Sequence, residues 1–254
     1  MGNYIVITGA SAGIGEASAR LFASKGKNLI LVARRENQLN DIKARIQADF
    51  PGVDVVVKPC DLADIDKLPA FYDEVKQYPL EAWINNAGFG ILENVKEHDL
   101  ARVLSMIRLN IEALTVLSVL FVKDFADKEG AKLVNISSGA GYTLAPMATT
   151  YCASKFFVSA FSEGLAHEMK MTGAKLQVKV LAPASTKTDF AKTAMQDDSI
   201  TYGKDSLYFS KYNTAEEMAD FLYQLYTSDK VLGLVNHENF TLSLLDPQFK
   251  HLYG

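Results

Sequence analysis

Short apolar runs alternate with helical patterns along most of the chain. The apolar runs have the length and composition of buried strands and cover Tyr4–Ile7, Asn28–Ala33, Val53–Val57, Glu81–Asn85, Lys132–Ile136 and Leu176–Leu181. Between them, helical patterns cover Glu16–Lys25, Asn37–Phe50, a segment that starts near Pro69, Asp99–Phe125 and Thr150–Met171. This alternation predicts an α/β fold with a parallel, doubly wound sheet that is covered on both faces.

One segment breaks the alternation. We find no internal repeat and no linker rich in Pro, Gly or Ser, so a single domain over residues 1–254 is the simpler organisation. The region from Pro183 to Asn213 is irregular and carries the large side chains Phe190, Met195, Tyr202, Leu207, Tyr208, Phe209 and Tyr212. Because ligands bind beyond the carboxyl ends of parallel strands, this region either covers a substrate or is a packed surface loop.

Composition excludes several classes of function. The 254 residues are 48% hydrophobic and 22% charged, with a net charge of −4, so the chain can bury a full core but has no basic face for nucleic acid. No uninterrupted apolar stretch reaches the roughly 18 residues of a membrane span, and we expect a soluble, cytoplasmic protein without a membrane partner. Cys60 and Cys152 stand apart from one another, and the histidines show no ligand spacing, so no metal is expected.

The stretch TGASAGIG, residues 8–15, follows the first apolar run and precedes a helix. A strand, a tight glycine turn and a helix together direct unpaired N–H groups and the helix dipole at an anion, typically a pyrophosphate. In this interpretation Gly9 makes the turn, Gly13 lets the backbone approach the ligand, and Gly15 allows close helix packing. The signal is moderate alone, because tight turns need glycine without any ligand.

Tyr151 and Lys155 are four residues apart, which places the phenol and the ammonium on one helical face. A tyrosine with its ordinary pKa near 10 is a poor acid–base catalyst at neutral pH. The positive charge of Lys155 is expected to lower the pKa of the phenol. A Tyr-x-x-x-Lys pair is also common on amphipathic helices, so it too needs other motifs beside it.

Three polar positions accompany this pair. Ser138 lies in a polar turn after a strand, where it can hydrogen-bond a substrate oxygen beside Tyr151. Asn110 stands inside an otherwise apolar helix, where its amide either caps a local kink or holds a water. The run Asn85–Gly88 follows a strand and suits a turn beside a cofactor ribose.

Over residues 3 to about 190, these motifs in this order resemble the short-chain dehydrogenase/reductase family; Asp61, after the third strand, also matches. The resemblance implies a Rossmann-like sheet and a catalytic tetrad of Asn110, Ser138, Tyr151 and Lys155. Tyr151 would protonate a carbonyl oxygen, Ser138 would stabilise its negative charge, Lys155 would hold the nicotinamide ribose and tune the tyrosine, and Asn110 would order a water. The implied cofactor contacts are Gly9, Ser11, Gly13, Ile14, Gly15, Arg34, Arg35, Asp61, Leu62, Asn86, Ala87, Gly88, Tyr151, Lys155, Pro183, Thr186 and Thr188.

The end of the second strand bears on the choice of cofactor. Members of the family that prefer NAD carry an acidic residue there, and this chain has Ala33 followed by Arg34 and Arg35. Guanidinium groups match a 2′-phosphate in charge and geometry, which favours NADP. In the alternative interpretation the two arginines are simply exposed to solvent, and Glu36 partly neutralises their charge. The resemblance alone favours reduction as the direction.

The C-terminal quarter departs from the family pattern, so the resemblance leaves the oligomeric state open. A homo-oligomer, dimer or tetramer, is expected through helix faces that carry Val116, Leu120, Phe156, Phe157 and Phe161, although these side chains suit an intrachain core equally well.

The predicted function is NADP(H)-dependent reduction of a ketone or aldehyde in a small to medium apolar molecule. Phe89, Leu144, Met147 and the aromatic loop after Pro183 supply the apolar preference. Two alternatives stay open: an oxidising alcohol or sugar dehydrogenase, and a regulator that binds NADPH without catalysis.

Overall fold

An eight-stranded sheet runs through the centre of the computed structural model, which describes residues 2–204, 206 and 209–250. The strand order is β10-β9-β6-β5-β4-β1-β2-β3. The strands are β1 (Tyr4–Thr8), β2 (Asn28–Ala33), β3 (Val55–Pro59), β4 (Leu80–Asn85), β5 (Lys132–Ile136), β6 (Gln177–Ala182), β9 (Leu232–Val235) and β10 (Leu242–Leu245). The order reverses at β1, between β2 and β4, which confirms a doubly wound α/β sheet of the Rossmann type.

The sheet is not wholly parallel, which corrects the prediction. β10 pairs antiparallel with β9, whereas the other neighbouring strands pair in parallel. Residues 236–241 join these two strands, and so short a connection returns the chain as a hairpin because a parallel pair needs a longer crossover.

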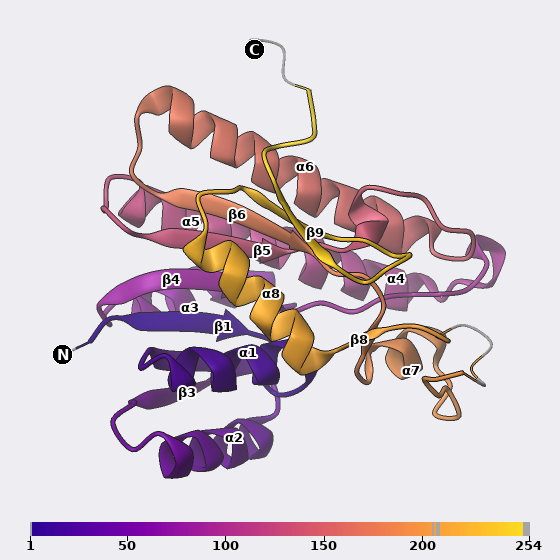
Figure 1. The fold of residues 1–254 in the computed structure, drawn as a ribbon, viewed down its shortest axis with the longest axis horizontal. Coiled ribbons are helices and arrows are strands. Elements are labelled where there is room, and N and C mark those ends of the chain that lie inside the picture. The colour runs from indigo at the N-terminus through magenta and orange to yellow at the C-terminus, as the bar shows by residue number, and fades with distance from the viewer. Residues whose placement is uncertain (1, 205, 207–208, 251–254) are drawn as a thin grey trace.

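Helices cover both faces of the sheet (Figure 1). On one face α1 (Gly13–Ser24), α2 (Glu36–Asp49) and α8 (Ala215–Thr227) pack in one apolar cluster, and on the other α3 (Leu68–Val75), α5 (Leu114–Phe125) and α6 (Thr149–Thr172) form a second. β1 shows the cause, because Ile5 and Ile7 join the first cluster while Val6 joins the second. Side chains that alternate between two buried faces give the continuous apolar run of a central strand.

A single long helix was predicted over Asp99–Phe125, and it contains a π-helical turn. The Asp99 side chain caps its start by accepting from the Arg102 N–H, and α4 (Leu100–Ile107) then runs through η3 (Arg108–Ala113) into α5. By length and composition this helix could cross a membrane, but Leu117, Phe121 and Phe125 pack it against the sheet. Its outer face stays open, with Leu100 70% and Leu104 46% exposed.

The irregular segment after β6 contains short elements of its own. β7 (Thr186–Lys187) pairs with β8 (Asn213–Thr214), and α7 (Phe190–Met195) lies between them. Leu207 and Tyr208 lie outside the described residues. The other short elements are the 3-10 turns η1 (Ile65–Lys67), η2 (Val95–Glu97) and η4 (Gly139–Gly141).

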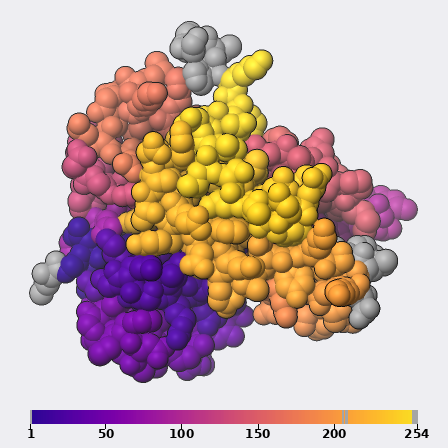
Figure 2. Space-filling view, viewed as in Figure 1, coloured from indigo at the N-terminus to yellow at the C-terminus, as the bar shows by residue number. Residues whose placement is uncertain are grey.

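The C-terminal residues gather in one patch on the face shown in Figure 2, where they appear in yellow. Their anchor is Glu163, a carboxylate on α6 that is 2% exposed. Glu163 Oε2 accepts from the Gln248 and Phe249 N–H groups at 2.6 and 2.8 Å, and Oε1 accepts from the Tyr142 hydroxyl at 2.6 Å. The Tyr142 ring stacks on Phe249 with centroids 5.5 Å apart. A buried carboxylate therefore fixes the path of the chain end.

Glu163→Ala is expected to release this end and to lower the free energy of unfolding by about 1–3 kcal/mol, because three hydrogen bonds to a buried carboxylate are lost. Amide hydrogen exchange at Gln248 and Phe249 measures the release. Glu168→Ala, at an exposed position of the same helix, should leave those amides protected. Unchanged protection in Glu163→Ala would show that side-chain stacking alone holds the segment.

Candidate active site

A cavity of about 1350 Å³ opens at the carboxyl ends of the central strands. The predicted site residues line it, apart from Gly15 and Asn110. They come from the turns after β1, β2, β3, β4, β5 and β6 and from the start of α6. A doubly wound sheet brings these turns to one edge, so the topology unites motifs that are far apart in sequence.

The glycine turn after β1 has the conformation that its sequence predicts. Gly9 and Gly13 have φ angles of +66° and +56°, which disfavour residues with a side chain. A Cβ on Gly15 would lie 2.3 Å from the Gly9 carbonyl oxygen. Gly15 therefore lies behind the turn and serves helix packing, and its role as a cofactor contact stays a prediction.

The turn fits a dinucleotide pyrophosphate. α1 begins after Ala12, which has no side-chain group to cap the first N–H groups of the helix, and Ala12, Gly13 and Ile14 line the cavity. Free N–H groups at a helix start, approached through glycine, make a site for phosphate. Asn86 supports the turn from β4, because its Nδ2 donates to the Thr8 carbonyl oxygen at 2.9 Å.

Two arginines border the cavity after β2. Arg35 Nε and Nη2 donate to Ser11 Oγ at 3.2 and 2.9 Å, so this guanidinium lies against the glycine turn. Arg34 lines the same wall and is exposed. Asp61 and Leu62, after β3, line the cavity as well. This end of the cavity thus has the positive charge that a phosphate group requires.

Tyr151 and Lys155 lie side by side at the start of α6. The Lys155 ammonium is 5.9 Å from the centre of the Tyr151 ring and donates to the Ile136 carbonyl oxygen at 2.9 Å. An ammonium has three N–H donors, and this bond uses one of them. Burial lowers the pKa of Lys155 to about 8, because the interior disfavours its charge.

The pKa of Tyr151 moves in the direction opposite to our prediction. Burial raises it to about 12, although a hydrogen bond with Ser138 acts to lower it. Desolvation of the phenolate outweighs this hydrogen bond, and Lys155 is not among the causes of the shift. Tyr151 therefore keeps its proton at neutral pH and is ready to act as an acid.

Ser138 lines the cavity, whereas Asn110 lies behind its wall. Ser138 Oγ accepts from the Ala140 N–H. Asn110 sits in the π-helical turn, where Oδ1 accepts from the Phe89 N–H at 3.1 Å and Nδ2 donates to the Phe89 carbonyl oxygen at 2.9 Å. Nδ2 also lies 3.2 Å from Ser154 Oγ. Asn110 thus stands behind the cavity wall and joins the long helix to α6 and to the turn after β4.

The substrate side of the cavity is largely apolar, with Phe89, Leu144, Phe190, Tyr202 and Phe209 among its lining residues. Met147 does not line the cavity, and its role as a substrate contact stays a prediction. It has a positive φ of 63° and is 43% exposed.

Sequence reasoning missed many of the lining residues, among them the polar side chains of Arg102 and Tyr142. Arg102 precedes Asn110 by eight residues, about two helical turns, so a search along the helical face that carries Asn110 could have found it. Tyr142 had no such signal. In the described parts of the chain, no three His, Cys, Asp or Glu side chains are close enough to hold a metal ion.

The family model of short chain dehydrogenases matches residues 3–199, most of the chain. The protein is a short-chain dehydrogenase. Enzymes of this family are oxidoreductases that bind a nicotinamide cofactor, in agreement with the glycine turn and the Tyr151–Lys155 pair.

Relatives and solved structures support the assignment of this short-chain dehydrogenase. It is 31% identical over 248 residues to a sulfoacetaldehyde reductase of Chromohalobacter salexigens, with 94% of this chain and 92% of that protein covered. It is 30% identical over 190 residues to a very-long-chain 3-oxoacyl-CoA reductase-like protein of Arabidopsis thaliana, covering 73% of this chain and 61% of that protein. A short-chain dehydrogenase from Sphingobium yanoikuyae, solved with NADPH, superposes with a TM-score of 0.82 at 27% identity, covering 91% and 87% of the two chains.

Proposed function

We propose that this short-chain dehydrogenase uses NADPH to reduce the ketone or aldehyde group of a small to medium apolar substrate to an alcohol. The observation that carries the proposal is the buried Tyr151, which lies beside Ser138 and Lys155 in a cavity that the glycine turn also lines.

In the proposed reaction a bound nicotinamide supplies a hydride to the carbonyl carbon. The Tyr151 hydroxyl gives its proton to the carbonyl oxygen, and the Ser138 hydroxyl donates a hydrogen bond to that oxygen as negative charge develops. The two remaining N–H donors of Lys155 bind the nicotinamide ribose. Asn110 keeps the Phe89 turn and α6 in register, and its ordering of a water stays a prediction.

In this proposal the cofactor is held by the turns at the carboxyl ends of the strands. The glycine turn binds the pyrophosphate, Asp61 and Leu62 bind the adenine, and the turn after β4 borders the ribose. Pro183, Thr186 and Thr188 border the nicotinamide. We propose reduction as the direction, with the Tyr151 hydroxyl as the proton donor, since oxidation would need its phenolate as a base. Names of relatives that specify aldehyde and 3-oxoacyl reductases point the same way.

The test is to follow NADPH consumption with a panel of aldehydes, ketones and diketones, and to compare NADH and the reverse reaction with alcohols. Faster turnover in the reductive direction supports the proposal. Faster alcohol oxidation would assign an oxidising dehydrogenase, and cofactor binding without turnover would assign a regulator.

The segment 183–213, which supplies Phe190, Tyr202 and Phe209 to the cavity, is the proposed substrate cover.

The preference for NADPH is expected to depend on the two arginines after β2. Arg34→Ala combined with Arg35→Ala should lower kcat/KM for NADPH by roughly 100-fold, since charge-assisted bonds to a 2′-phosphate are lost. Activity with NADH should change little. Arg20→Ala, which removes an exposed partner of Asp49, is the control. Equal losses with both cofactors would place the arginines on the shared part of the dinucleotide.

We further propose that the protein is cytoplasmic and forms a homo-oligomer, a dimer or tetramer. The homo-oligomer is supported by apolar side chains on the outer faces of the long helix and α6. Leu104, Val119 and Phe157 are 46%, 40% and 38% exposed there. Sedimentation equilibrium of the purified chain measures the oligomeric state directly.

A further inference from the structure

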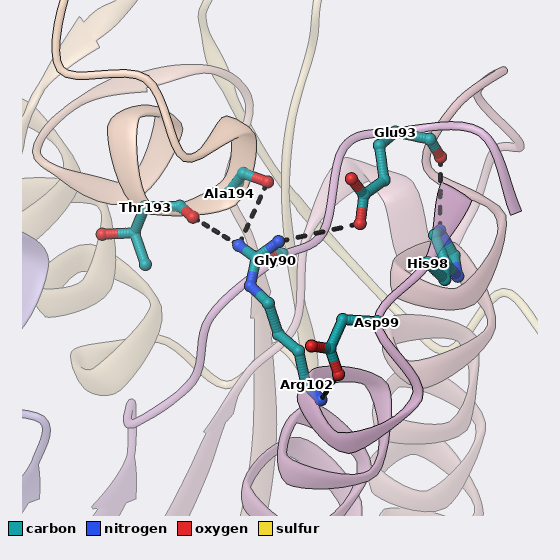
Figure 3. Close-up of polar contacts among 7 residues, drawn as sticks. All are labelled: Gly90, Glu93, His98, Asp99, Arg102, Thr193 and Ala194. Carbon is teal, nitrogen blue, oxygen red and sulfur yellow. Dashed lines mark hydrogen bonds and ion pairs between the residues drawn. The ribbon is translucent and has the colours of Figure 1, made fainter.

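Arg102, on α4, binds the end of helix α7. Figure 3 shows the guanidinium directed at the end of α7, where Nη2 donates to the Thr193 and Ala194 carbonyl oxygens. Its other side faces Glu93, whose Oε1 lies 3.8 Å from Nη1. The Leu92 N–H also donates to the Ala194 oxygen, at 3.1 Å. A cation and a main-chain donor therefore bind the last carbonyls of α7, which no further helical turn satisfies.

A second contact seats the other end of α7. A Cβ on Gly90 would lie 2.7 Å from Phe190 Cζ and 3.4 Å from Ala194 Cβ, so Gly90 leaves the room that the Phe190 ring occupies. The absence of a side chain at this position, rather than a special backbone conformation, is what the contact requires. Arg102 thus binds the end of α7, whereas Gly90 lies against Phe190 at the start of α7 and against Ala194 near its end.

Phe190 connects this seat to the reacting group. Its ring centre is 5.5 Å from that of Tyr151, and both rings belong to one apolar cluster with Ile91 and Met106. The position of α7 thus decides how closely an apolar wall approaches the phenol. A wall at this place limits the size of the group that a carbonyl can carry on that side.

We propose that Arg102 is a positioning residue for substrate selection. It holds α7 so that Phe190 lies beside Tyr151, and it thereby favours a carbonyl with one small substituent over a ketone with two bulky ones. The inference rests on the proposed function for its substrate, but the fastening of α7 is a property of the protein itself. The two parts are tested separately.

The fastening is tested by amide hydrogen exchange, which needs no turnover. In Arg102→Gln we expect hydrogen exchange at the Leu92 and Thr193 amides to accelerate roughly tenfold or more, because α7 detaches from Arg102 and opens locally more often. Arg108→Gln, which changes an exposed arginine of the same long helix, is the matched control and should leave both amides unchanged. Unaltered exchange in Arg102→Gln would overturn the proposal, even if no carbonyl compound were ever reduced.

Selection is tested with propanal as the small substrate and propiophenone as the bulky one. Arg102→Gln should raise KM for propanal by roughly tenfold with a smaller change in kcat, which is the pattern of lost binding. The ratio of kcat/KM for propanal to that for propiophenone should fall by about fivefold or more. Arg102→Lys keeps the positive charge but loses the planar guanidinium, so we expect it to restore the substrate ratio only in part.

Gly90→Ala provides an independent variant, because its methyl group displaces Phe190 while Arg102 stays in place. It should shift the same substrate ratio in the same direction. An unchanged ratio in both Arg102→Gln and Gly90→Ala, with faster exchange in α7, would show that α7 plays no part in selection. An equal loss with both substrates together with weaker NADPH binding would assign Arg102 a general structural role and would also overturn the proposal.

Discussion

Tyr151→Phe should lower kcat for carbonyl reduction by roughly 1000-fold and leave NADPH affinity almost unchanged. The variant keeps the ring, which packs beside Phe190, and removes only the hydroxyl that gives the proton. Because burial keeps that hydroxyl protonated, no other state of Tyr151 needs to be populated before the reaction. Steady-state rates with saturating NADPH, together with a fluorescence titration of the cofactor, measure the two quantities.

Tyr223→Phe is a suitable control, because Tyr223 lies on α8 against Phe22 and does not line the cavity. It should react at the normal rate. Undiminished turnover in Tyr151→Phe would contradict the proposed mechanism and direct attention to another proton donor.

The second large effect concerns Lys155 and pH. In the proposed mechanism its ammonium must be charged to hold the ribose, and burial lowers its pKa to about 8. The charged form therefore prevails below pH 8 and is lost as the pH rises through that value, so kcat/KM should fall about tenfold per unit at higher pH. Lys155→Met should lower kcat/KM by roughly 100-fold at pH 7 and abolish this decline. A profile of kcat/KM from pH 6 to about 10 measures both.

The chain offers a matched control in Lys179, a second buried lysine whose pKa is also lowered to about 8. Its ammonium donates to the Ser228 and Lys230 carbonyl oxygens, away from the cavity lining. Lys179→Met should keep the decline above pH 8 if it folds, which a melting curve checks. A decline that disappears in Lys179→Met and persists in Lys155→Met would assign the titration to the fold instead of to the site.

The central sheet could be predicted from sequence because each of its first six strands is a short apolar run. β2 and β5 begin and end at the predicted residues, whereas β3 starts at Val55 instead of Val53. β9 and β10 escaped prediction because each has four residues, and a glycine interrupts the pattern at Leu232–Val235. So short a segment becomes a strand through pairing with its neighbours, which local sequence does not encode.

The site was predictable where its chemistry is local. The glycine turn and the Tyr151–Lys155 pair are each fixed by the spacing of a few consecutive residues. The Arg102 contact with Thr193 spans 91 residues and involves a main-chain oxygen, so no residue type at the far end marks it. The sign of the Tyr151 pKa shift was missed for a related reason. The charge of Lys155 is visible in sequence, whereas the loss of solvent around the phenol depends on the whole fold.

Glu163 recognises the main chain of residues 248 and 249 and makes no demand on their side chains. A substitution at Gln248 therefore keeps its hydrogen bond to Glu163, whereas one at Phe249 also loses the stacking on Tyr142. Leu245 and Ser243 of the preceding strand also line the cavity. The path of the chain beside this part of the cavity thus depends on one buried carboxylate and one stacked ring that lie outside the strand itself.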